Sequence, residues 1–139
     1  MLKSNFKSFE KELQRELDEQ KKEQKDTFRK LVFTTFTDVV KRSPVDKGYF
    51  RANNLIQSVT PNRATVDSTE GAGKLANDAK VKIDSTRVND GTTIFITNNL
   101  PYADRLENGY SKQAPTGIYK IAEARTRRIV EQLKREVIK

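Results

Sequence analysis

Residues 4–42 contain neither Pro nor Gly, and their apolar side chains recur at intervals of three and four positions. On a helix that turns about 100° per residue, this spacing forms one stripe. Gln20 and Gln24 keep the stripe in phase through a polar stretch. We therefore predict one long helix, with a break at residues 18–27 as the alternative. The apolar stripe consists of Phe6, Phe9, Leu13, Leu17, Phe28, Leu31, Val32 and Val39.

This predicted helix is too long for the rest of the chain to cover. At about 1.5 Å per residue it exceeds roughly 50 Å, whereas a compact chain of this size is about 37 Å across. We expect a single domain over residues 1–139, with residues 1–27 as a projecting helical arm. The arm would contact another chain, and the alternative is a solvated, partly frayed helix. The apolar residues expected at that contact are Phe6, Phe9, Leu13 and Leu17.

The chain turns sharply beyond this helix. Pro44 disfavours helical geometry at the residue before it, and Gly48 gives the backbone the freedom to turn. Two short β-prone segments, residues 55–60 and 64–66, follow this turn. Because a Pro-Asn-Arg sequence at residues 61–63 lies between them, they predict a hairpin.

Three further elements complete the predicted fold. Helical spacing over residues 75–83 favours a short helix over the strand that Val81 and Ile83 would also allow. Residues 92–97 are rich in Thr and Ile and predict a strand. An amphipathic helix begins at about Gly117. This order of elements predicts an α+β domain with a long N-terminal helix, a small antiparallel sheet and a C-terminal helix.

The residue types present leave few routes to catalysis. The chain has no Cys and no His, so it lacks a thiol nucleophile, a thiolate metal site and the imidazole that most often acts as a base. Hydrophobic residues make up 35% of the chain and charged residues 33%. We therefore expect a modest core under a heavily charged surface, with no enzymatic activity, no cofactor and no metal.

Charge and hydropathy bear on location and partners. The first residues lack the apolar core of a signal peptide, and no segment approaches the roughly 20 apolar residues that cross a bilayer. We expect no membrane partner and synthesis in the cytoplasm. The net charge of +8 divides as +3, +1 and +4 over residues 1–42, 43–115 and 116–139. Basic ends suit an anionic neighbour, either nucleic acid or an acidic protein surface, or serve solubility alone.

Residues 43–53 and 94–117 hold the least generic patterns in the chain. In the first stretch, we expect the carboxylate of Asp46 to accept hydrogen bonds from backbone amides of its own turn. Arg51 has the charge to form an ion pair with Asp46 or with Glu107 of the second stretch. Such contacts would hold the two stretches together.

The second stretch predicts a strand that turns into a short helix. Pro101 has no amide proton for a ladder, so it is expected to end the strand. Tyr102, Ala103 and Leu106 then have helical spacing. Gly109 can supply the positive φ that stops a helix.

These two stretches resemble the head–tail connector proteins of long-tailed bacteriophages, which include neck, tail-completion and minor tail components. That family shows a Pro-Val-Asp-x-Gly-x-x-Arg turn after a first helix, which residues 44–51 match. It also shows a strand running into Asn-x-x-Pro-Tyr-Ala, then Leu-Glu-x-Gly-x-Ser and Gln-Ala-Pro-x-Gly, as in residues 98–117. The matched order covers residues 43–117, whereas the charged helix of residues 1–30 has no counterpart.

The resemblance implies a structural virion protein at the junction of head and tail. Such a protein forms a ring, expected here to be a hexamer, around a channel that DNA passes without sequence-specific binding. Its other partners would be head-completion, tail-terminator or tail-tube proteins. We expect neighbouring subunits to contact the basic face of the last helix and the loop before it, which has little apolar area to fix it within the chain. The residues expected at these contacts are Tyr110, Gln113, Pro115, Arg127, Arg128 and Arg135.

Two other functions fit parts of the sequence. A nucleic-acid-binding module would follow phosphates with the basic stripe of the last helix, although no aromatic side chains interleave that stripe. A metal-dependent nuclease would combine Asp46 with Asp78 and Lys80, because metal-assisted hydrolysis needs carboxylates near a lysine. Such carboxylates normally lie on adjacent strands, whereas Asp46 is expected in a turn and Asp78 in a helix. The basic stripe consists of Arg125, Arg127, Arg128, Lys134 and Arg135.

Overall fold

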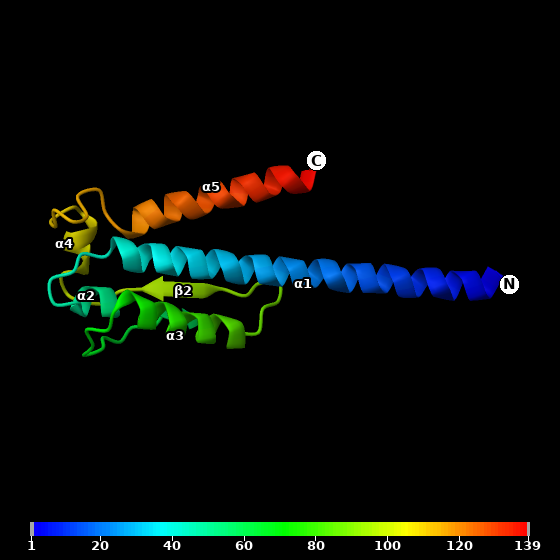
Figure 1. Cartoon of the computed structure of the whole chain (residues 1–139), viewed down its shortest axis with the longest axis horizontal. Helices are drawn as coiled ribbons and strands as arrows, with labels where there is room; N and C mark the ends of the chain where they lie inside the picture. The colour runs from blue at the N-terminus through cyan, green and yellow to red at the C-terminus, as the bar shows by residue number, and fades with distance from the viewer. Residues whose placement is uncertain (1, 139) are drawn as a thin grey trace.

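A computed structural model describes the backbone of residues 2–138 and the side chains of residues 7–136. The fold is α+β, as predicted, with a long first helix, a two-stranded antiparallel sheet and a long last helix (Figure 1). The elements in chain order are α1 (Leu2–Arg42), α2 (Tyr49–Ala52), β1 (Leu55–Ser58), α3 (Ala72–Ser85), β2 (Ile94–Thr97), α4 (Ala103–Glu107) and α5 (Tyr119–Ile138).

Helix α1 is the axis of the molecule. It runs without interruption through its polar middle, so the alternative of a break at residues 18–27 is wrong. The middle is rich in Glu, Lys and Gln, whose straight side chains lose little freedom in a helix. In Figure 1, α3 and the sheet lie on one side of the C-terminal half of α1 and α5 lies on the other. The N-terminal half extends past all of them.

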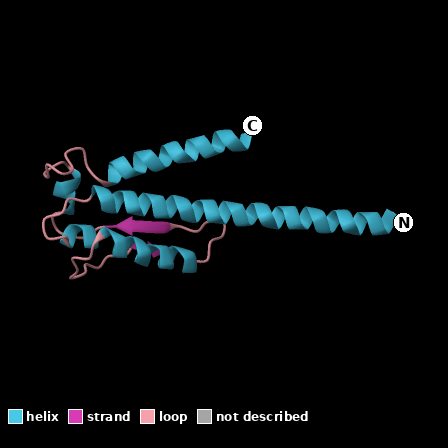
Figure 2. Cartoon of the chain, viewed as in Figure 1, coloured by secondary structure: helices cyan, strands magenta, loops and turns pink. Residues whose placement is uncertain are grey.

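The sheet pairs segments that are distant in sequence. Strand β1 lies antiparallel to β2, with Leu55 opposite Thr97 and Ser58 opposite Ile94. Figure 2 shows the sheet in magenta alongside the long first helix. The predicted hairpin is therefore wrong, because residues 59–71 form no strand. The amide of Asn53 replaces a strand partner for part of this segment, since it accepts from the Val66 N–H at 2.8 Å and donates to the Val66 carbonyl at 3.0 Å.

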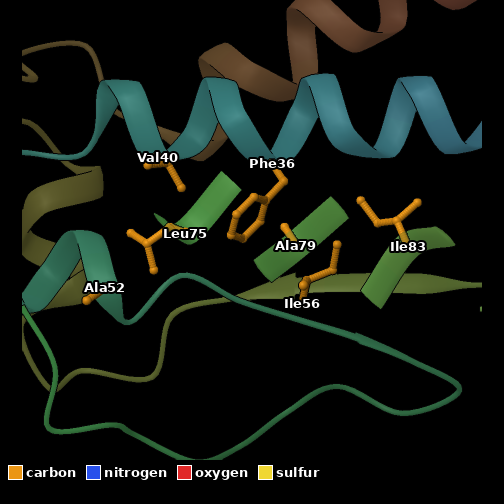
Figure 3. Close-up of a cluster of buried hydrophobic side chains, with 7 residues drawn as sticks. All are labelled: Phe36, Val40, Ala52, Ile56, Leu75, Ala79 and Ile83. Carbon is orange, nitrogen blue, oxygen red and sulfur yellow. The ribbon is translucent and has the colours of Figure 1, made fainter. Parts of the chain in front are cut away.

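One hydrophobic core lies between α1, α3 and the sheet (Figure 3). Phe36 of α1 is 2% exposed and points between the helix and strand that face it. The predicted helical spacing of residues 75–83 is confirmed, because α3 presents every fourth residue to this core. Burial of each large apolar side chain stabilises the fold by about 1.5–3 kcal/mol. The buried members are Phe36, Val40, Ala52, Ile56, Leu75, Ala79 and Ile83.

A second core lies on the opposite side of α1. Val39 of α1 and Phe50 of α2 pack there against the start of α5 and the loop before it. Ile118 has no exposed surface, and Ala122 is 1% exposed. The last helix is thus anchored at its N-terminal end, and its axis diverges from α1 toward residue 138 (Figure 1).

Candidate interfaces and the motif corner

The two motif stretches meet at one end of the molecule, and we call residues 43–54 and 98–119 the motif corner. Glu107 is its main charged contact. One carboxylate oxygen accepts hydrogen bonds from the N–H groups of Ile118 and Tyr119, both at 2.9 Å, and the other accepts from Lys120 N–H at 2.9 Å. The first turn of a helix has unpaired N–H groups and a positive partial charge. Glu107 therefore caps α5 from α4, the preceding helix.

The loop that follows Glu107 doubles back on itself. Gly109 has φ +91°, so its predicted positive φ is confirmed. A Cβ atom at this position would lie 2.5 Å from the Pro115 carbonyl oxygen, closer than any side chain tolerates. The glycine of the Leu-Glu-x-Gly pattern is therefore explained by a turn and a close backbone contact.

Gln113 fastens this loop to the turn after α1. Its side-chain oxygen accepts from the Val45 N–H at 2.9 Å, and its side-chain nitrogen donates to the Val45 carbonyl at 3.1 Å. The adjacent Ala114 is 5% exposed and belongs to the second core. The expectation that little fixes this loop within the chain is wrong, because the sequence does not show that a backbone segment 68 residues away lies beside it. Tyr110 and Pro115 remain exposed.

Asn54 is the central residue of a buried polar network that the sequence did not point to. Its side-chain oxygen accepts from the Tyr119 hydroxyl at 2.7 Å and from the Asn98 amide at 3.2 Å. Its side-chain nitrogen donates to the Ser43 hydroxyl at 2.8 Å and to the Arg51 carbonyl at 3.1 Å. All four bonding positions of the amide are used. The one available signal was the recurrence of Asn on either side of the two β segments.

Burial changes the proton affinity of one member of this network. Burial, and secondarily the nearby charge of Glu107, raises the pKa of Tyr119 well above its ordinary value. The hydroxyl therefore stays protonated and donates to Asn54 throughout the neutral and mildly alkaline range.

Two predicted contacts of the corner are wrong. The described side chains show no ion pair between Arg51 and either Asp46 or Glu107, because the Glu107 carboxylate is occupied by the start of α5. Asp46 is exposed, and its turn is held instead by Gln113 and by Gly48, whose φ is +97°. The positive φ of Gly48 therefore shapes this turn, whereas the Asp46 carboxylate forms no hydrogen bond within it among the described contacts.

The prediction that Pro101 ends the strand is wrong. Strand β2 stops at Thr97, after which the side-chain amide of Asn98 bonds to α2 and that of Asn99 bonds to the loop after β1. Asn98 donates to the Phe50 carbonyl at 2.9 Å, and Asn99 donates to the Asn62 carbonyl at 2.8 Å. Pro101 instead is the second residue of the turn before α4, which the Ala103 N–H closes by donating to the Leu100 carbonyl at 3.0 Å, and its fixed φ suits that position. The predicted helical turn at residues 102–106 is confirmed as α4, and Tyr102 packs on the Phe50 ring at 6.2 Å between centroids.

The projecting part of α1 carries the apolar side chains predicted for an interface. Every side chain of residues 7–26 is exposed. Phe9 is 62% exposed, Leu13 46% and Leu17 42%. Phe6 lies outside the residues whose side chains are described. Because single exposed apolar residues are common but an aligned series is not, this stripe is a candidate contact surface.

The basic stripe of α5 is partly neutralised within the chain. Arg125 donates to Asp38 of α1 at 2.8 Å, Arg127 pairs with Glu123 at 2.5 Å, and Lys134 pairs with Glu131 at 3.4 Å. Among the described side chains of residues 7–136, none forms an ion pair with Arg128 or Arg135, which are both exposed. Arg125 therefore acts as a link between the two long helices.

The carboxylates of the nuclease hypothesis are in separate places. Asp78 lies on α3, where it pairs with Lys74 at 3.3 Å, and Lys80 pairs with Asp84 at 3.0 Å. Asp46 lies in the turn before α2. In the described part of the chain, no three His, Cys, Asp or Glu residues are close enough to hold a metal ion. The helices within residues 2–138 include none with the length and apolar character needed to cross a bilayer.

Comparisons of the chain with protein-family models, with curated proteins and with solved structures find no match.

Proposed function

We propose that the chain is a structural subunit that assembles with copies of itself into a ring at the junction of a phage head and tail. The observation that carries the proposal is the exposed apolar stripe of α1, on a helix longer than the domain it belongs to. A helix with three large apolar side chains exposed in one line gains stability when a second protein surface covers it. Its location at the head–tail junction rests on the resemblance of residues 43–117.

The motif corner supports the same proposal in another way. Glu107, Gln113 and Asn54 make the turns at this end depend on one another, so that α1, α2, α4 and α5 meet in a fixed arrangement. A subunit that joins two larger assemblies needs such rigidity, because its contacts must repeat identically from copy to copy. The exposed Tyr110 and Pro115 lie on the outside of this corner, where a neighbour would meet them. The subunit's work is mechanical: rings stack, join and leave the bore open.

The proposal is tested by the mass and shape of the purified protein. Native mass spectrometry should show a closed oligomer, and electron microscopy should show rings with an open bore. Leu13→Asp combined with Leu17→Asp should shift the mass toward the monomer while circular dichroism stays the same. Val81→Asp is the matched control, because Val81 is a 69% exposed apolar residue on α3, away from the arm. A wild-type protein that stays monomeric at high concentration would overturn the proposal.

Two further measurements separate the ring from its rivals. In phage particles that contain the chain, gold-labelled antibody should mark the junction of head and tail. Reversing the charge of Arg127, Arg128 and Arg135 should block assembly, whereas affinity for free duplex DNA should be weak with or without the change. Tight, steeply salt-dependent DNA binding that these reversals abolish would favour a nucleic-acid-binding module.

A further inference from the structure

The stripe on α1 repeats every eleven residues along the whole helix. Its members are spaced three, four and four positions apart, and this triplet recurs without a phase shift. Eleven residues in three turns correspond to about 3.67 residues per turn, which suits helices that lie nearly straight along one another with a slight right-handed twist. The stripe is formed by Phe6, Phe9, Leu13, Leu17, Gln20, Gln24, Phe28, Leu31, Thr35 and Val39.

Near the motif corner, this stripe already has a helix beside it. The Thr35 hydroxyl hydrogen-bonds the Thr126 hydroxyl of α5 at 2.5 Å, and Val39 packs with Ala122. Farther along α1, α5 diverges, and the arm continues beyond the end of α5 (Figure 1). The face of α1 that binds a helix within the chain is thus the same face that is exposed at Phe9 and Leu13. The arm presents an existing helix-binding face with no helix on it.

Charged residues of largely opposite sign flank the exposed stripe. At about 100° per residue, an acidic row falls on one flank and a mainly basic row on the other, where Glu10 and Asp18 are the exceptions. All of these side chains are exposed. The acidic row is Glu12, Glu16, Glu19 and Glu23, and the basic row is Lys7, Lys21 and Lys25.

Within one chain this segregation is unfavourable. Glu12 and Glu16, Glu19 and Glu23, and Lys21 and Lys25 are like charges four positions apart, which destabilise a helix, and the opposite charges at the same spacing, Arg15–Glu19 and Asp18–Lys22, offset only part of this. Over residues 7–25 the structure shows no ion pair to offset this repulsion, and the side-chain hydrogen bond found there joins Gln14 to Asp18 at 3.0 Å. A neighbour that brings opposite charges to each flank would remove the repulsion.

The two possible orientations of a neighbouring arm place different flanks together. When two identical helices pair in parallel, the left flank of one meets the right flank of the other, so here the acidic row meets the basic row. When they pair antiparallel, like flanks meet, and Glu faces Glu. Like-charge juxtaposition across an interface is strongly unfavourable. Charge complementarity therefore selects the parallel arrangement.

We infer that the arms of neighbouring copies pair in parallel and in register along this stripe, with the occupant of each arm's exposed face being the arm of another copy. The inference rests on the proposed ring and deepens it, because arms that run along the rotation axis of a ring all point in the same direction. In this arrangement, Lys21 and Lys25 of one copy lie beside Glu19 and Glu23 of the next. Gln20 and Gln24 meet their counterparts at the polar centre of the stripe and discourage slippage of the register.

Two charge variants test the pairing. Glu16→Lys, Glu19→Lys and Glu23→Lys together make both flanks basic, whereas Lys21→Glu and Lys25→Glu make the second flank acidic like the first. Each variant alone should associate at least about tenfold more weakly than the wild type at low salt. An equimolar mixture of the two should recover association, because basic flanks then meet acidic ones.

A matched control uses charges of the same arm that point away from the stripe. Lys11→Glu with Lys22→Glu changes the charge as much as Lys21→Glu with Lys25→Glu, yet both residues lie on the opposite face of the helix. This control should associate as the wild type does. If it weakens association as much as the flank variant, net charge and not the flank pairing is responsible, and the inference falls.

Cysteine cross-linking tests the orientation directly, because the chain has no cysteine of its own. Leu13→Cys and Gln24→Cys place thiols about 16 Å apart along the arm. In a parallel, in-register arrangement, each variant forms cross-links with itself through a short bismaleimide, and a mixture gives no 13-to-24 product. A 13-to-24 product without either self-product would show antiparallel arms and overturn the inference.

The outcomes separate this inference from the proposed ring. Rings that form while the arms fail to cross-link, or while both charge variants associate normally, would overturn the parallel arms alone. Self-cross-links at both positions in a species no larger than a dimer would support the parallel arms and overturn the ring. A wild-type chain that neither associates nor cross-links would overturn both.

Discussion

The two halves of α1 follow one hydrophobic repeat and yet have opposite surroundings. In the half near the motif corner, Val39 of the stripe is buried against α5, and Phe36 and Val40, on the opposite face of the helix, are buried against α3 and the sheet. In the other half, Phe9, Leu13 and Leu17 are exposed. The comparison teaches that a hydrophobic period identifies the face of a helix that can be buried by packing against another element. It does not identify whether that partner belongs to the same chain.

The hydrogen bonding of polar side chains also differs between the motif corner and the arm. At the motif corner, the amides of Asn54 and Gln113 are bonded to groups more than 60 residues away, and the carboxylate of Glu107 is bonded to the start of the next helix. On the arm, the charged rows have no such bonds in the described structure. Substitutions at the motif corner should therefore lower the free energy of unfolding of the monomer, whereas substitutions on the arm should weaken association between copies.

The largest expected difference is between two phenylalanines of α1. Phe36→Ala should lower the free energy of unfolding by about 3–5 kcal/mol, because the side chain is 2% exposed in the first core and its removal leaves a cavity. Phe9→Ala should change it by less than about 0.5 kcal/mol. The measurement is urea unfolding at protein concentrations low enough to keep the chain monomeric. A large loss in Phe9→Ala would place the arm in the intrachain core and remove the contrast.

The second difference is between two side-chain amides. Asn54→Ala should lower the free energy of unfolding by about 2–3 kcal/mol, because it leaves the buried Tyr119 hydroxyl and Ser43 hydroxyl with fewer partners. Gln20→Ala, on the exposed stripe of the arm, should leave monomer unfolding unchanged. Chemical denaturation of both variants beside the wild type checks this. Equal stability of the two variants would mean that water replaces the Asn54 network without cost.

Much of the fold could be predicted from the sequence because its long elements have strong periodicity. The stripe of α1, the helical spacing of α3 and α5 and the β-branched run of β2 are local signals, and each produced the element that it predicted. The pairing of β1 with β2 could not be predicted, since 35 residues lie between the strands and nearby residues 64–66 offered a closer partner. A local pattern does not show which of two segments will pair with a given strand.

The features of the motif corner were likewise predictable only where their cause is local. The positive φ of Gly48 and Gly109 could be expected, because turn glycines have a local cause. The partners of Glu107, Gln113 and Asn54 could not, because each depends on where the chain returns after many residues. The Arg51 ion pair was expected from charge alone and is absent from the described contacts, since the backbone of α5 reaches the Glu107 carboxylate instead. Charge indicates which side chains can pair, and the fold decides which do.

A third prediction concerns two glycines in the globular end. Gly109→Ala should lower the free energy of unfolding by about 2 kcal/mol, because its φ of +91° and the Pro115 carbonyl 2.5 Å from the added carbon are both unfavourable. Gly73→Ala is the matched control, since it lies in α3 with open space around it and should be neutral or slightly stabilising. Thermal unfolding of both variants is the measurement. A neutral Gly109→Ala would show that the loop moves freely and that the corner is less rigid than the arm comparison requires.

The smallest effect is a pH dependence that belongs to the motif corner alone. Because burial raises the pKa of Tyr119 in the folded state, both states hold the proton below the unfolded value of about 10, and the full stability is present there. Above that pH the unfolded chain releases the proton and the folded chain keeps it, so the free energy of unfolding falls as pH rises. Between pH 10 and 11 the wild type should lose about 1 kcal/mol more than Tyr119→Phe. Tyr110→Phe is the control, because Tyr110 is 76% exposed, and this variant should keep the wild-type slope in urea titrations at the two pH values. If Tyr119→Phe keeps that slope as well, the fold does not hold the Tyr119 hydroxyl protonated above its ordinary pKa.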